Sequence, residues 1–90
     1  MLKIHNSGLF NSKYRSLIKN DKAMQSLILE RIFLFRKNLD DTRLHNHPLK
    51  KSMEGKWSFS ITNDIRIVYE WIGKTTVRFL MIGPHKDVYH

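Results

Sequence analysis

The chain has 90 residues, of which 16 are Lys or Arg and 8 are Asp or Glu, so its formal net charge is +8. It has no cysteine, which excludes disulfides, cysteine-ligated zinc and a thiol nucleophile, and no apolar run long enough to span a bilayer. The length predicts a single domain over residues 1–90, and the charge predicts a polyanionic partner: nucleic acid, an acidic protein or an anionic membrane. The opening residues MLKIHNSG lack the apolar segment of a secretion signal, so we expect a cytoplasmic protein.

The first part of the chain predicts a strand followed by a two-helix hairpin. Residues 2–5 alternate apolar and polar side chains, as a short strand does, and residues 6–8 predict a turn. Apolar residues at helical spacing predict a helix over residues 10–18. A wide apolar stripe without Gly or Pro predicts a second helix over residues 22–39, which Asn20 or Asp21 can cap. Its stripe consists of Met24, Leu27, Ile28, Ile32, Phe35 and Leu39.

Three further apolar residues of the second helix, Leu29, Phe33 and Leu34, lie off that stripe. The helix is therefore apolar nearly all round in its middle. An apolar surface of this kind favours contact with a second element or a partner. Membrane is the least expected partner, because neither helix is a basic amphipath with one clean apolar face.

The second part predicts a polar connection over residues 40–55 and then strands over residues 57–61, 65–71 and 77–82, separated by turns at 62–64 and 73–74. Val88 and Tyr89 are expected to add a last short strand. The fold class is therefore α+β: a short N-terminal strand, a two-helix hairpin and an antiparallel meander of three to four strands. We expect the helices to cover the face with Phe59, and a polar site on the opposite face with Ser58, Ser60 and Arg66.

A histidine-containing loop is the first candidate for chemistry. His45 and His47 stand two residues apart, a spacing that can suit a metal, but no acidic or cysteine ligand follows at a diagnostic distance, so we expect no metal. The alternative is that both are solvated loop residues. Lys50, Lys51 and Lys56 flank the loop and would attract phosphates without regard to sequence, or serve as ordinary surface lysines.

Two more candidates lie on or after the last strands. His85 follows Gly83 and Pro84 at the loop end of the sheet, where an imidazole can donate or accept a proton; alternatively it caps the strand. Arg66 offers a planar fork of donors suited to a phosphate. The alternative for Arg66 is an ion pair with Glu70 on the same face.

Four segments together resemble the RelE/ParE toxin superfamily, most closely its YafQ-like and RelE-like messenger-RNA interferases. They are residues 47–49, 55–59, 64–69 and 82–89, and the most specific is the C-terminal Gly83-x-His85-x-x-Val88-Tyr89. The predicted strand, helical hairpin and meander follow the order of that family, although the helices match only in pattern. The resemblance implies a RelE-like fold.

The resemblance also implies a ribosome-dependent, metal-free and cofactor-free endoribonuclease that cuts mRNA by attack of a ribose 2′-hydroxyl and is silenced by a cognate antitoxin. By the YafQ pattern, His47 and Asp64 match positions of proton transfer, His85 matches the general acid, and Tyr89 matches an aromatic residue that orients the RNA. By the RelE pattern, Arg66 matches a phosphate-stabilising arginine. The off-stripe apolar residues of the second helix then provide a foothold for the antitoxin.

Three residues depart from the YafQ pattern: Ser60, Ile65 and Met81 stand where those enzymes carry His, Trp and Arg. Two alternatives therefore stay open. One is a ParE-like inhibitor of DNA gyrase, and the other is an RNA-binding homologue with impaired catalysis. A gyrase inhibitor has no need of proton-transfer groups around one pocket, so His47 and His85 favour the nuclease.

Overall fold

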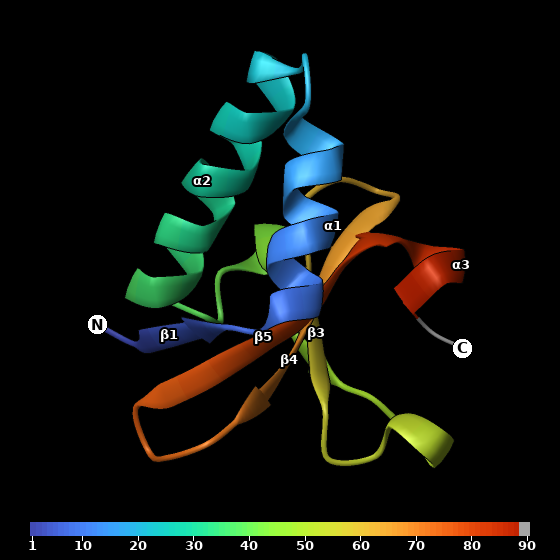
Figure 1. Ribbon diagram of the computed structural model, residues 1–90. Coiled ribbons are helices and arrows are strands. Elements are labelled where there is room, and N and C mark those ends of the chain that lie inside the picture. The colour runs from blue at the N-terminus through green and yellow to red at the C-terminus, as the bar shows by residue number, and fades with distance from the viewer. Residues whose placement is uncertain (89–90) are drawn as a thin grey trace.

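The computed structural model describes residues 1–88. Two helices stand side by side and cover one face of a sheet, and the N-terminus and α3 lie on opposite sides of the molecule (Figure 1). The elements in chain order are β1 (Lys3–Asn6), α1 (Gly8–Ile18), α2 (Lys22–Lys37), η1 (Thr42–Leu44), β2 (His47–Pro48), η2 (Lys51–Met53), β3 (Trp57–Ser60), β4 (Ile65–Trp71), β5 (Thr76–Pro84) and α3 (His85–Val88).

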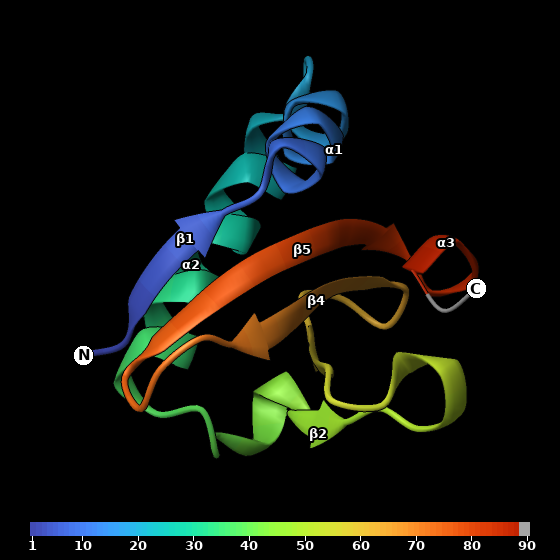
Figure 2. The same cartoon turned by 60° about the horizontal axis from the view of Figure 1, so that its bottom comes forward.

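The sheet is mixed and has five strands in the order β1-β5-β4-β3-β2. The strands β3, β4 and β5 form the expected antiparallel meander, and β2, which lies in the segment expected to be an irregular connection, pairs antiparallel with β3. β1 adds to the edge of β5 in parallel, with Lys3 opposite Thr76 and Asn6 opposite Phe79, an arrangement that Figure 2 shows from below. The predicted α+β class is confirmed. The alternation of side chains predicts the N-terminal strand but does not predict which strand it pairs with.

Side-chain caps fix where both helices begin. The Oγ of Ser7 accepts a hydrogen bond from the Phe10 N–H at 3.0 Å, and Asp21 Oδ1 accepts one from the Met24 N–H at 2.9 Å. Of the two candidate caps for α2, Asp21 is therefore the one used. Asn20 instead has a positive φ of 58°, in the tight link between the helices.

We expect Asp21→Ala to lower the free energy of unfolding by about 1 kcal/mol, because the first turn of α2 then loses a side-chain acceptor for an unpaired N–H. Thermal or urea unfolding followed by circular dichroism measures the change. Asp21→Ser keeps a capping oxygen and serves as the matched control. Equal stability of the Ala variant and the wild type would contradict the capping role.

The core forms between the helices and the sheet, on the face predicted to carry Phe59. Phe35 of α2 stacks on Phe59 with ring centroids 4.3 Å apart and meets the edge of Tyr69 at 4.9 Å. The Tyr69 hydroxyl donates to Asn46 Oδ1 at 2.6 Å, and burial raises the pKa of that hydroxyl. The remaining stripe residues of both helices are buried or pack against the same cluster.

The structure corrects two expectations about the sheet. Ser58 and Ser60, expected on an open polar face, are 0% and 6% exposed. Val88, expected in a strand, belongs to the helical turn α3. Pro84, the last residue of β5, is opposite Ile65, the first residue of β4. The residues after Pro84 therefore have no residue of β4 beside them. Without a partner for its N–H and C=O groups, the chain forms a helical turn there.

The apolar surface of α2 is smaller than the sequence indicates. Leu29 and Phe33 are 52% and 53% exposed, whereas Leu34 packs against the core. Leu34 stands seven residues after Leu27, two helical turns along, and so shares its side of the helix. Within residues 1–88, no helix has the length and hydropathy needed to cross a membrane.

Candidate functional site

The two predicted catalytic histidines lie together in one cleft. Residues 47–53 form one wall of this cleft, which has a volume of about 420 Å³, and His85 lines it from the start of α3. In Figures 1 and 2 the η2 segment and α3 lie on the same side of the molecule. Both histidines are exposed, so a ligand in solution can reach them. The cleft thus joins residues that are far apart in the sequence.

The hydrogen bond of His47 defines which of its nitrogens can act as a base. Its Nδ1 lies 2.7 Å from the carbonyl oxygen of His45. A carbonyl oxygen only accepts, so Nδ1 carries the proton and the lone pair of the neutral ring is on Nε2. His45 itself has a left-handed backbone with φ 49°, which aims that carbonyl. This geometry leaves Nε2 as the acceptor nitrogen of His47 for proton abstraction.

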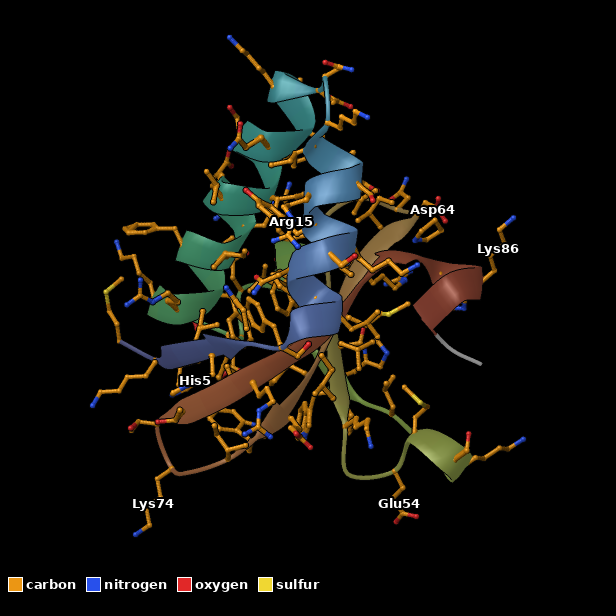
Figure 3. The ribbon with its side chains drawn as sticks, in the orientation of Figure 1. His5, Arg15, Glu54, Asp64, Lys74 and Lys86 are labelled. Atoms are coloured by element: carbon orange, nitrogen blue, oxygen red, sulfur yellow. The ribbon has the colours of Figure 1, made fainter. Side chains whose placement is uncertain are left out.

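Asp64 contacts the backbone of His85. Its Oδ1 accepts a hydrogen bond from the His85 N–H at 3.4 Å, and Figure 3 shows Asp64 beside the start of α3. The turn that presents Asp64 is stabilised by Thr62 Oγ1, which accepts from the N–H groups of Asp64 and Ile65 at 3.1 and 2.9 Å. The carboxylate is therefore placed to position His85.

The three predicted RNA-binding lysines divide into two groups. Lys50 and Lys51 line the histidine cleft, and Lys51 has a left-handed backbone with φ 59°. Lys56 is half-buried, and its backbone closes the loop by pairing with Leu49 and Met53 at 2.8 and 3.0 Å. Two cations therefore flank the histidines, while the third lies at the base of the loop.

Arg66 lines a different hollow, of about 500 Å³, together with Ser60 and Asn63. Its Nη1 donates to Ser60 Oγ at 2.7 Å and its Nη2 to the Asn63 carbonyl at 3.4 Å. The alternative ion pair with Glu70 is wrong, because Glu70 pairs with Arg78 at 3.0 Å. Arg66 is opposite Gly83 in the sheet, two residues before His85. His45, two residues before His47 of the histidine cleft, also lines this hollow.

Two positions noted in the sequence remain, Tyr89 and Met81. Tyr89 lies outside the described residues. Met81, at a position where YafQ-like enzymes carry Arg, is opposite Val68 in the sheet and half-buried. No group of three or more His, Cys, Asp or Glu side chains able to hold a metal occurs within residues 1–88. Sequence reasoning missed Ser52 and Met53, which line the cleft, since they lie in an irregular loop where no periodicity reveals orientation.

Comparison with solved structures finds several toxins of the same fold. A copper-bound mutant toxin from Helicobacter pylori is 25% identical, with a TM-score of 0.79 over 99% of this chain and 100% of the toxin. YafQ from E. coli strain BL21(DE3) is 22% identical, with a TM-score of 0.79 over the whole of both chains. A YoeB/ParE toxin from Agrobacterium tumefaciens is 24% identical, with a TM-score of 0.79 over 93% of this chain and 99% of the toxin.

YafQ has also been solved in complex with DinJ, in a toxin–antitoxin complex from E. coli. In that form it is 23% identical to this chain, with a TM-score of 0.77 over the whole of both chains. No protein-family model and no curated protein sequence matches the chain. Because these likenesses cover nearly every residue, the chain matches the RelE/ParE/YafQ/YoeB toxin family in structure, at low sequence identity.

Proposed function

We propose that the chain is the toxin of a type II toxin–antitoxin pair and that it cleaves mRNA at the ribosome without a metal or cofactor. The observation that carries the proposal is the cleft in which His47 and His85 lie together with two lysines. Paired imidazoles provide the base and the acid that phosphodiester cleavage requires. The fold match to YafQ and YoeB/ParE toxins supports the same assignment.

In this mechanism His47 acts as the general base. Its Nε2 removes the proton of a ribose 2′-hydroxyl, and the 2′-oxygen forms a bond to the adjacent phosphorus. The bond from phosphorus to the 5′-oxygen breaks, and His85 gives that oxygen a proton. The products are a 2′,3′-cyclic phosphate and a 5′-hydroxyl. Asp64 holds the backbone of His85, and Lys50 and Lys51 attract the negative phosphates.

Mapping mRNA ends after induced expression tests this function. We expect primer extension to find new 5′ ends inside translated regions, within minutes of induction and before growth stops. A gyrase inhibitor would leave mRNA ends unchanged and would block supercoiling by purified gyrase. Purified toxin with mRNA, with and without ribosomes, then separates ribosome-dependent cleavage from cleavage of free RNA.

The exposed apolar surface of α2 supports the proposal of an antitoxin partner. Leu29 lines a hollow of about 390 Å³ between the helices and the sheet, with Tyr14 and Ile32 among its walls. Phe33 lies on the same helix with Lys37 Nζ 5.4 Å from its ring centre. Apolar side chains beside cations fit an acidic partner segment that carries its own apolar residues. Leu34, packed against the core, would support this surface from below.

We expect Leu29→Asp to weaken binding of the cognate antitoxin by about 10- to 100-fold, because a buried interface would then contain an unpaired carboxylate. Isothermal titration calorimetry with the purified cognate antitoxin measures the effect. Leu9→Asp is the matched control, since Leu9 of α1 is equally exposed, at 52%. Equal affinities for the two variants would move the antitoxin surface away from α2.

A further inference from the structure

We propose that the hollow beside the edge of β3 is a phosphate-binding subsite in which Arg31 and Arg43 hold the RNA phosphate next to the scissile phosphate, to which Arg66 is assigned. The hollow has a volume of about 500 Å³, and three arginines from three different elements line it: Arg31 of α2, Arg43 of η1 and Arg66 of β4. His45 and the consecutive residues Ser60, Ile61, Thr62 and Asn63 complete its walls. The inference rests on the proposed function and deepens it, because it places the substrate's phosphates.

Two of these arginines have donors that protein groups do not satisfy. Within residues 1–88, no hydrogen-bond partner exists for the buried Nε of Arg31 or for the buried Nε of Arg66. Because these two Nε atoms are buried, a ligand in the hollow does not contact them; their unpaired N–H groups mean that no protein acceptor offsets the positive charge at either atom. A phosphate would instead bind the Nη groups that line the hollow, since its oxygens match the geometry of a guanidinium.

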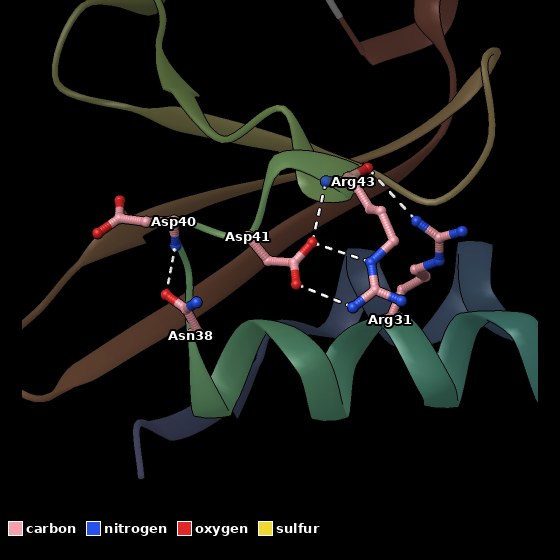
Figure 4. Close-up of polar contacts among 5 residues, drawn as sticks. All are labelled: Arg31, Asn38, Asp40, Asp41 and Arg43. Atoms are coloured by element: carbon pink, nitrogen blue, oxygen red, sulfur yellow. Dashed lines mark hydrogen bonds and ion pairs between the residues drawn. The ribbon is translucent and has the colours of Figure 1, made fainter.

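The arginines are held in place by contacts that leave donors unused. Arg31 Nη1 donates to the Arg43 carbonyl at 3.3 Å, and Arg43 donates from Nε and Nη2 to the two oxygens of Asp41 at 3.0 and 2.9 Å (Figure 4). The side-chain hydrogen bond from Arg43 lowers the pKa of Asp41 to about 2, so this carboxylate stays ionised in neutral solution. Nη1 of Arg43 is not used in that pair.

The charge of the hollow favours an anion, and its position favours RNA. No Asp or Glu is among the described residues that line it, and Asp41 neutralises only one of the three guanidinium charges. The hollow adjoins the histidine cleft at His45, which lines the hollow and whose carbonyl oxygen lies 2.7 Å from Nδ1 of His47 in the cleft. An extended RNA strand that passes from His47 in the cleft to His45 in the hollow would bring a neighbouring phosphate to the arginines. A free acidic peptide has no such connection to the cleft.

The test compares Arg31→Gln with Arg15→Gln, which removes the same charge from an exposed position on α1. The probe is a short fluorescent RNA with 2′-O-methyl groups, which the protein cannot cut, and its binding is followed by anisotropy over a range of salt concentrations. We expect Arg31→Gln to raise Kd about tenfold more than the control. The slope of log K against log salt should fall by about 0.7 in magnitude, the value of one phosphate contact on a single strand.

Three comparisons make the result decisive. With a neutral methylphosphonate backbone, the difference between the variants should vanish. Arg43→Gln should repeat the effect if Arg31→Gln proves unfolded by circular dichroism. Equal Kd values for folded Arg31→Gln and Arg15→Gln overturn the subsite, as does dependence on Arg31 seen only with a poly-glutamate peptide. If the protein binds RNA through Arg31 but does not cleave mRNA, the proposed nuclease function is overturned and the subsite stands.

Discussion

Replacing His85 by alanine is expected to slow mRNA cleavage by about 10²- to 10⁴-fold, the range that positioned proton transfer contributes. His85 faces the cleft from the first position of α3, and Asp64 holds its backbone N–H. Without the imidazole, the 5′-oxygen must leave without a proton. Antitoxin binding should be unchanged, since the proposed antitoxin surface is on α2.

Single-turnover cleavage of mRNA on programmed ribosomes measures this effect. His5→Ala is the matched control, because His5 is exposed on β1, on the side of the molecule away from α3 (Figure 3). A substrate with sulfur in place of the 5′-oxygen needs no acid, so the defect of His85→Ala should disappear with it. The defect of His47→Ala, which removes the base, should remain. A wild-type rate for His85→Ala with the ordinary substrate would remove His85 from the acid role.

Periodicity predicted most elements of this fold, because burial on one face imposes a regular spacing on the residues of a helix or strand. The stripe of α2 and the alternation of β3 and β4 are of this kind. The pairing of β1 with β5 escaped prediction, since four backbone partners more than seventy residues apart in the chain leave no local pattern. Leu34 was placed off the apolar stripe because the stripe residue on its side of the helix, Leu27, lies two turns away and not one.

The candidate site was only partly predictable for the same reason. Resemblance to a family named His47 and His85, but their shared cleft depends on the path of an irregular loop, which no spacing describes. An ion pair between Arg66 and Glu70 was the alternative interpretation, because both side chains share a face of one strand. Four residues along a strand, however, span about 13 Å. Arg78 is directly opposite Glu70 on β5, where cross-strand partners meet. Arg66 instead donates to Ser60 and Asn63 in the hollow beside β3.

Arg66→Ala is expected to slow cleavage by about 10²- to 10³-fold, equivalent to about 2.7–4 kcal/mol of transition-state stabilisation, the loss seen when one donor to a developing oxyanion is removed. The half-buried guanidinium is fixed on a rigid strand by Ser60 and Asn63, so the second N–H of each Nη costs little to orient toward a phosphate. Single-turnover cleavage on programmed ribosomes measures the rate, and circular dichroism confirms that the variant is folded.

Two further variants separate chemistry from structure at this position. Arg66→Lys keeps the charge without the planar fork, so we expect it to recover only part of the lost rate. Ser60→Ala removes the acceptor that orients the guanidinium, and we expect a loss smaller than that of Arg66→Ala, with the slope of binding against salt unchanged. If Arg66→Ala cleaved at the wild-type rate and only unfolded more easily, its hydrogen bonds to Ser60 and Asn63 would be its whole role. The charge on the developing phosphorane would then have to be met by Lys50 and Lys51, the cations that share the cleft with His47 and His85.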